Sequence, residues 1–199
     1  MNKAVRTSAT PPLAASPGSW QRLTAHSGEW RLCLLVNRWA ARRWATTLFT
    51  AVSRLGDGLF WYALMVVLAL LGGGRGVQAA LHMLATGGVA LLLYRGLKRW
   101  TRRPRPFREH QGIIARVPPL DEFSFPSGHT LHAVSFTLVA LAYQPMLAWL
   151  LLPFTALVGA SRVVLGLHYP SDVIAAGVIG TALASLSLRL VPGVSLFAP

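Results

Sequence analysis

A series of long apolar segments separated by short polar stretches most constrains what this chain can fold into. The segments cover residues 58–71, 76–97, 130–143, 146–160 and 173–190. Several are shorter than the roughly 20 helical residues that cross a bilayer, so their flanking residues must complete each span. Charged residues make up only 13% of the chain, against about 25% in an average soluble domain. The pattern predicts an all-α integral membrane bundle with five or six transmembrane helices, rather than an apolar soluble protein.

Two N-terminal segments fall outside this pattern. Residues 1–28 are rich in Ala, Ser, Thr and Pro and contain no apolar run of signal-peptide length, so we expect a disordered basic tail. The membrane domain then covers 29–199. Within it, 31–54 has apolar residues at helical spacing interrupted by three arginines. Each charge at a bilayer centre costs about 2.5–3.5 kcal/mol, which favours an amphipathic interfacial helix over a first transmembrane helix.

The net charge of +13 indicates an anionic partner. The cations gather in 38–54 and 95–108, next to apolar segments, which fits anionic lipid headgroups or a phosphate site better than nucleic acid. Cys33 is the single cysteine, so the chain has no internal disulfide framework. We expect membrane lipids and a lipid phosphate as partners, with neither nucleic acid nor an obligate protein partner.

Three clusters of polar residues stand at segment ends or in the loop between 98 and 125. They are Lys98 with Arg105-Pro106, then Pro126-Ser127-Gly128-His129, then Ser161-Arg162 with His168 and Asp172. A phosphoryl group in transfer carries charge on its non-bridging oxygens, and fixed cations and backbone N–H groups stabilise that charge. Each cluster alone could equally be a headgroup contact or an ordinary helix cap.

The second and third clusters also supply proton-transfer groups. Ser127 can cap the following helix, and Gly128 allows the backbone to approach an anion closely. His129 would then lie at the edge of the phosphate, able to protonate a leaving oxygen. Asp172 follows His168 by four residues and can accept a hydrogen bond from one ring nitrogen. That bond would leave the other nitrogen free as a nucleophile.

In order and spacing, the three clusters resemble the signature of the type 2 phosphatidic acid phosphatase superfamily. That signature reads Lys, six residues, Arg-Pro; Pro-Ser-Gly-His; and Ser-Arg, five residues, His, three residues, Asp, and this chain fills every position. The resemblance implies that His168 forms a phosphohistidine, that Asp172 orients it, and that His129 protonates the leaving group. It also implies a phosphate site made of Lys98, Arg105, Ser127, Gly128 and Arg162.

The resemblance further implies a metal-independent hydrolase of lipid phosphoric esters or diphosphates that needs no cofactor. The six acidic residues are scattered along the chain, so we expect no metal site. Undecaprenyl diphosphate is the first expected substrate, with phosphatidylglycerol phosphate, phosphatidate and lipid A phosphates as alternatives. Phosphoryl transfer to another lipid remains open. A lipid-phosphate-binding protein without turnover is disfavoured, because binding alone needs no nucleophile.

The resemblance places the active site on the periplasmic face of a bacterial inner membrane. The positive-inside rule points the other way, because the loop between the first two clusters is rich in arginine. We expect the periplasmic face, because Lys98, Arg105 and Arg162 are assigned to the phosphate and because a motif filled at every position outweighs a statistical bias in short loops.

Five further polar residues are interpreted without a catalytic role. Asp57 with Gly58 predicts a helix start. Asp121 and Glu122 are interpreted as residues at the rim of the active site that select among substrates. His132 is interpreted as a satisfied polar residue, and His82 as a functional candidate without an identified partner.

Overall fold

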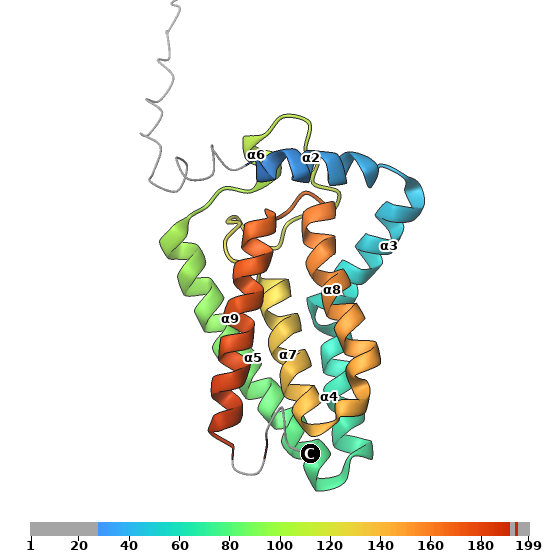
Figure 1. Cartoon of the computed structure of the whole chain (residues 1–199), viewed down its shortest axis with the longest axis vertical. Helices are drawn as coiled ribbons and strands as arrows, with labels where there is room; N and C mark the ends of the chain where they lie inside the picture. The colour runs from blue at the N-terminus through green and yellow to red at the C-terminus, as the bar shows by residue number, and fades with distance from the viewer. Residues whose placement is uncertain (1–27, 192–193, 195–199) are drawn as a thin grey trace, which may run out of the picture.

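The computed structural model describes residues 28–191 and 194, and every regular element in this part of the chain is a helix. The elements are α2 (Glu29–Trp39), α3 (Arg43–Arg54), η1 (Leu55–Leu59, a π-helical turn), α4 (Phe60–Leu71), α5 (Gly73–Thr101), α6 (Pro106–Glu109), α7 (Gly128–Tyr143), η2 (Pro145–Leu147, a 3-10 turn), α8 (Ala148–Val164) and α9 (Pro170–Arg189). The long helices run side by side, and α2 and α6 lie across one end of the bundle (Figure 1). The tail predicted over 1–28 lies outside the described residues except for Gly28.

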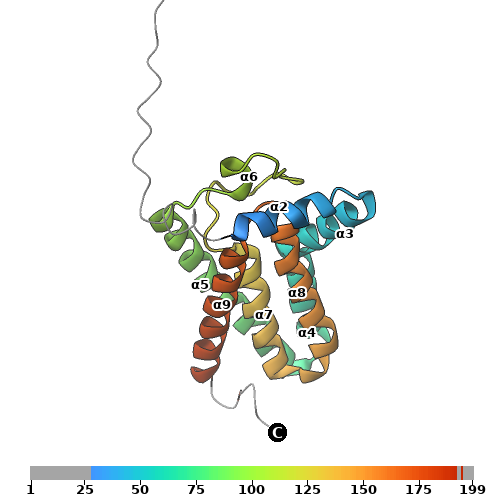
Figure 2. The same ribbon diagram turned by 45° about the horizontal axis from the view of Figure 1, so that its top comes forward.

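Four stretches are long and apolar enough to cross a membrane. They are Arg43–Leu71, Gly73–Glu109, Pro145–Val164 and Pro170–Arg189. The 16 residues of α7 are fewer, about 24 Å of helix at 1.5 Å per residue, but α7 packs against α5, α8 and α9 in the middle of the bundle (Figures 1 and 2). Counting α7, five spans cross the bundle in alternating directions within the described part of the chain. The predicted all-α membrane bundle is confirmed.

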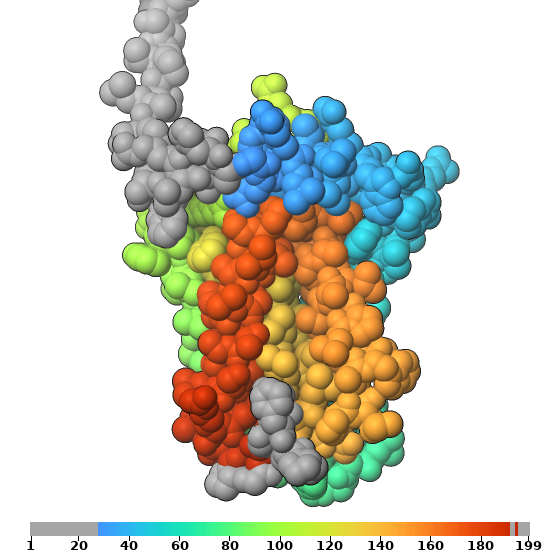
Figure 3. All heavy atoms as spheres, viewed as in Figure 1, coloured from blue at the N-terminus to red at the C-terminus, as the bar shows by residue number. Residues whose placement is uncertain are grey.

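The segment over 31–54, interpreted as one helix, is two helices in the structure. Only α2 lies across the end of the bundle, over α8 and α9 (Figure 3), while α3 continues through η1 into α4 as one bent span. The side chain of Asn37 holds α2 there: its Nδ2 donates to the carbonyls of Ile114 (2.9 Å) and Val164 (3.0 Å), and its Oδ1 accepts from the Ile114 N–H (3.0 Å). These bonds tie α2 to the end of α8 and to the loop that follows α6.

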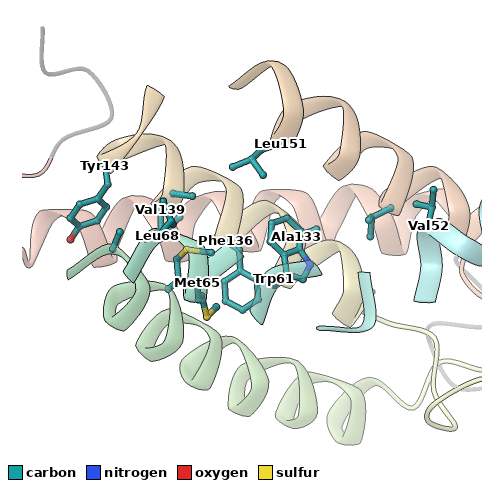
Figure 4. Close-up of a cluster of buried hydrophobic side chains, with 14 residues drawn as sticks. Val52, Trp61, Met65, Leu68, Ala133, Phe136, Val139, Tyr143 and Leu151 are labelled. Carbon is teal, nitrogen blue, oxygen red and sulfur yellow. The ribbon is translucent and has the colours of Figure 1, made fainter. Parts of the chain in front are cut away.

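The main core surrounds α7 and contains buried residues of α3, α4, α5, α8 and α9 as well (Figure 4). Trp61 of α4 is almost fully buried, and its ring centre lies 5.4 Å from that of Phe136 on α7. Leu151 of α8 is a buried residue of the same core. On α5, a Cβ at Gly87 would lie 2.7 Å from the Phe136 ring, so any larger residue there would force this ring to shift. This packing holds α7 at the centre of the bundle.

The alternating helix directions bring the three sequence clusters to one end. The C-terminal ends of α5 and α8 and the N-terminal ends of α7 and α9 all lie at the end that α2 crosses (Figures 1 and 2). The 102–127 connection, which includes α6, covers the same end. Clusters that lie 20 positions apart (Pro106 to Pro126) and 32 positions apart (His129 to Ser161) in the sequence therefore meet at one site.

Candidate active site

Two buried cations from the first cluster hold a carboxylate between them. Lys98, at the end of α5, is 5% exposed, and its Nζ lies 2.6 Å from each carboxylate oxygen of Asp121. Arg105 is 1% exposed and donates from Nη2 to Asp121 Oδ1 at 2.7 Å. Burial raises the pKa of Asp121, but the two cations outweigh this effect and bring it below the ordinary value of 3.8. Asp121, interpreted as a rim residue, thus occupies an anion site between Lys98 and Arg105.

His168 lies beside this anion site, on the short turn between α8 and α9. Its Nε2 is 3.3 Å from Arg105 Nη1. A guanidinium can only donate, so Nε2 is the acceptor nitrogen and the proton of the neutral ring is on Nδ1. Burial, followed by the charges of Arg105, Arg162 and Lys98, lowers the pKa of His168 well below 6.5. The ring is therefore neutral at pH 7, with an unprotonated Nε2 toward the cations.

Asp172 is the fully buried carboxylate behind His168. Its Oδ2 accepts the Tyr169 N–H at 2.8 Å, which forms a capping box at the start of α9, and also contacts the hydroxyl of Ser124. The same Oδ2 lies 3.6 Å from His168 Nδ1, an ion-pair separation longer than a hydrogen bond. The expected hydrogen bond from His168 Nδ1 to Asp172 is thus not formed in this structure, where the Oδ2 accepts from Tyr169 and contacts Ser124 instead.

The second cluster forms the start of α7. Ser127 is the residue before the helix, but its hydroxyl pairs with the Thr130 hydroxyl (3.0 Å) and does not cap the backbone as expected. The Ser127 N–H donates to the carbonyl of Asp172 (3.3 Å), which joins the second cluster to the third. Gly128 begins the helix, and His129 contacts Asp57 through Nε2.

Arg162 supplies the third buried cation, from the last turn of α8. It is 2% exposed and donates to the hydroxyl of Ser53 on α3. Together with Lys98 and Arg105 it surrounds the polar end of one cavity of about 740 Å³. The cavity also reaches His129, Gly128 and His168, and continues along apolar side chains of α4, α5 and α7: Trp61, Met65, Leu84, Leu91 and Phe136.

Six of the eight predicted site residues line this cavity, and two stand behind it. Ser127 and Asp172 are both fully buried and contact the lining residues from outside the cavity. His82 lies at the other end of the bundle, where its Nδ1 is 3.1 Å from the Tyr143 hydroxyl. The ring nitrogens of His132 lie 2.9 and 3.2 Å from backbone carbonyls of α7 and α5.

The sequence interpretation missed Arg103. Its guanidinium bridges two carboxylates, with Nη1 2.6 Å from Asp172 and Nη2 2.6 Å from Glu29 of α2, and it lies over the Tyr169 ring. Arg103 stands in a run of basic residues whose other members gave no reason to single it out. Only its burial distinguishes it from its exposed neighbour Arg102.

Asp57 lies in η1, next to the kink at Gly58 where one helix ends and the helix that continues as α4 begins, so the predicted helix start agrees with the structure. The prediction missed that the carboxylate of Asp57 contacts His129. Glu122 does lie on the surface, where it pairs with Arg108 at 3.4 Å. Within the described residues, no group of three or more His, Cys, Asp or Glu side chains is placed to hold a metal ion.

Comparison with known proteins identifies the family. Residues 76–195, which include all three clusters, match the model of the PAP2 superfamily. The chain belongs to the PAP2 superfamily. It is a membrane phosphatase of that superfamily, and the likeness extends from sequence to fold.

Two relatives and one solved structure show the range of this likeness. The undecaprenyl-diphosphatase BcrC of Bacillus subtilis is 33% identical over 131 residues, which cover 64% of this chain and 66% of that protein. Phosphatidylglycerophosphatase B of the same organism is 33% identical over 172 residues, 75% of each chain. The crystal structure of Aquifex aeolicus LpxE superposes with a TM-score of 0.70 at 25% identity, covering 80% of this chain and 93% of that one.

Proposed function

We propose that this PAP2 protein removes the terminal phosphate of a lipid diphosphate, with undecaprenyl diphosphate as the best candidate, through a phosphohistidine. One observation carries the proposal. A single cavity joins three buried cations and a neutral, buried imidazole at one end to an apolar wall between α4, α5 and α7 at the other. Such a cavity suits a molecule with a phosphorylated head and a hydrocarbon tail.

In the first step, Nε2 of His168 attacks the terminal phosphorus, and the bond from phosphorus to the leaving oxygen breaks. The ammonium of Lys98 and the guanidinium groups of Arg105 and Arg162 meet the charge on the non-bridging oxygens. His129 gives its proton to the leaving oxygen. The incoming phosphate takes the place that the Asp121 carboxylate holds in this structure.

In the second step, water attacks the phosphorus and the phosphorus–nitrogen bond breaks, which releases inorganic phosphate and restores neutral His168. His129, now unprotonated, accepts a proton from the water and returns to its starting state. Asp172 remains a carboxylate behind the imidazole and stabilises the proton on Nδ1. Its three other donors keep it in place throughout.

The names of two relatives favour two lipids as the main candidates for the substrate. BcrC carries the name undecaprenyl-diphosphatase, and its identity to this chain is 33%. Phosphatidylglycerol phosphate is the second candidate, because phosphatidylglycerophosphatase B is equally identical and matches a larger share of the chain. Phosphatidate, lipid A phosphates and transfer to a second lipid are distinguishable outcomes of the same assay.

We place the site on the periplasmic face of a bacterial inner membrane. With five crossing helices, α2 and the active site share one face, and α9 ends on the other. Exposed arginines are concentrated on the site face, but several belong to α2 and the start of α3, where they suit headgroup contacts of an interfacial helix. Cysteine substitutions in 111–118, in a Cys33→Ser background, should react with an impermeant thiol reagent in intact spheroplasts. Labelling only after lysis would place the site in the cytoplasm.

The test of function is phosphate release from a panel of lipids by the purified protein in proteoliposomes. Undecaprenyl diphosphate should be hydrolysed fastest, with phosphatidylglycerol phosphate next, and a chelator should leave both rates unchanged. His168→Ala is the matched control and should release no phosphate. Transfer would appear as labelled lipid instead of inorganic phosphate. Absence of turnover on every lipid, with a folded protein, would contradict the proposal.

A further inference from the structure

Asp57 contacts the imidazole of His129 from a part of the chain outside the residues that match the family model. Its Oδ1 lies against His129 Nε2, and the side chain is 37% exposed at the mouth of the cavity. The matched residues begin at 76, whereas Asp57 belongs to the bent first span. The active site thus contains two histidine–carboxylate pairs, one at His168 and one at His129.

A local irregularity of the helix directs Asp57 toward the site. The chain over Leu55–Leu59 widens into a π-helical turn, and Gly58 has a φ of 138°, a value that side-chain-bearing residues rarely adopt. Gly56, the residue before Asp57, packs against Val158 of α8. A Cβ added at Gly56 would lie 3.1 Å from a Val158 methyl. Two helices therefore meet at a kink, which Gly58 makes possible. Here the turn brings a carboxylate to the start of α7.

The charges around His129 are otherwise cationic. Burial disfavours an imidazolium at His129, and so do the charges of Arg162 on α8 and Lys98 on α5, while the facing ring of His168 is neutral. The carboxylates of Asp121 and Asp172 are held by other cations, Lys98 with Arg105 and Arg103 respectively. Among the described residues, Asp57 is therefore the carboxylate in contact with His129, and its charge offsets the cationic surroundings.

We propose that Asp57 is a positioning residue that holds His129 in the protonated, correctly oriented form needed to donate a proton to the leaving group. The proposal rests on the phosphatase function argued above. His129 gives its proton to the leaving oxygen in the first step and receives one from water in the second. Asp57 remains a carboxylate in both steps, so protons and charges balance without another reactant.

The proposal predicts a dependence on the leaving group. A lipid alcohol is a poor leaving group and needs the proton, whereas p-nitrophenolate leaves well without one. Loss of Asp57 should therefore slow hydrolysis of a lipid phosphate monoester strongly and hydrolysis of p-nitrophenyl phosphate little. A residue that merely supported the fold would affect both substrates equally.

The experiment compares Asp57→Asn with wild type on the best lipid phosphate monoester of the panel and on p-nitrophenyl phosphate. We expect kcat for the lipid to fall by about 10²-fold and kcat for the aryl ester to change by less than about twofold. The alkaline limb of the lipid kcat profile should move to lower pH, and Asp57→Glu should restore part of the loss. Glu109→Gln, at an acidic residue of α6 that does not line the cavity, is the control and should match wild type.

A double-mutant cycle completes the test. Adding Asp57→Asn to His129→Ala should cause no further loss, because Asp57 acts only through His129. Equal losses on both substrates, or additive losses in the double mutant, would overturn the proposal. Failure of the phosphatase function would look different, since wild type itself would release no phosphate from either substrate.

Discussion

The ammonium nitrogen of Lys98 lies 2.6 Å from both carboxylate oxygens of Asp121, and Arg105 binds the same carboxylate. Two oxygens of one anion thus fill the place where phosphate oxygens are expected. Since the pKa of Asp121 lies below its ordinary value, the carboxylate stays charged throughout the neutral range and competes with any incoming phosphate. Substrate binding must displace it.

Asp121→Asn should therefore bind anions more tightly. Removal of the competing charge raises the fraction of protein with a free cation pair, and apparent affinity rises with that fraction. We expect inhibition constants for inorganic phosphate and for vanadate to fall by about tenfold. Glu109→Gln removes a carboxylate that does not line the cavity and should leave both constants unchanged. Weaker inhibition of Asp121→Asn would show that Asp121 helps to form the anion site instead of occupying it.

Arg103→Met should destabilise the protein and impair catalysis together. The buried guanidinium neutralises Asp172 and ties it to Glu29 of α2, and breaking a buried ion pair costs about 3–5 kcal/mol. Denaturant unfolding in detergent micelles should show a loss in this range, with a reduced kcat at temperatures where the variant is folded. Arg102→Met is the control, because Arg102 is exposed, and its stability should equal that of wild type. An unchanged unfolding free energy for Arg103→Met would refute the bridging role.

The acid limb of the pH profile should lie below pH 6.5. Because burial and the nearby cations lower the pKa of His168, the ring stays neutral as the pH falls through the ordinary histidine range and becomes protonated only in stronger acid. The profile of kcat/KM reports the free enzyme, and should be corrected for ionisation of the substrate's own phosphate. A limb at or above pH 6.5 that belongs to His168 would contradict this electrostatic account.

The apolar part of the cavity should bind the lipid tail. Gly88 of α5 lines the cavity, and a Cβ added to it would meet no heavy atom within 4 Å, so Gly88→Phe can enter the space without a clash at its Cβ. We expect KM for a long-chain lipid phosphate to rise by roughly tenfold with little change for p-nitrophenyl phosphate. Gly96→Phe, also in open space on α5 but away from the cavity, is the matched control. Equal effects of the two variants would place the tail elsewhere.

The apolar segments predicted the fold, because a helix that crosses a membrane must be apolar over most of its length. They did not predict that 31–54 divides into α2 and a bent span. That division depends on the long-range hydrogen bonds of Asn37 to Ile114 and Val164, and such bonds leave no periodic signal in the sequence.

The three clusters predicted which residues converge at the site, but they did not predict the residues that contact them. Asp57, Asp121 and Arg103 each stand in a segment with an ordinary local explanation, as a helix start, a polar loop and a basic run. Their contacts with residues of the clusters span 69 positions for Arg103, 72 for Asp57, and 16 and 23 for Asp121. Only the folded chain shows that each carboxylate or cation lies against a residue of the clusters.

The most direct test is to trap the covalent intermediate. Protein exposed briefly to undecaprenyl diphosphate labelled with ³²P in its terminal phosphate, then quenched in alkali, should carry an acid-labile label that mass spectrometry locates on His168. His129→Ala should still form this label with an activated aryl phosphate, because that leaving group needs no proton, and His168→Ala should form none. Full phosphatase activity in His168→Ala, or label on another residue, would contradict the mechanism.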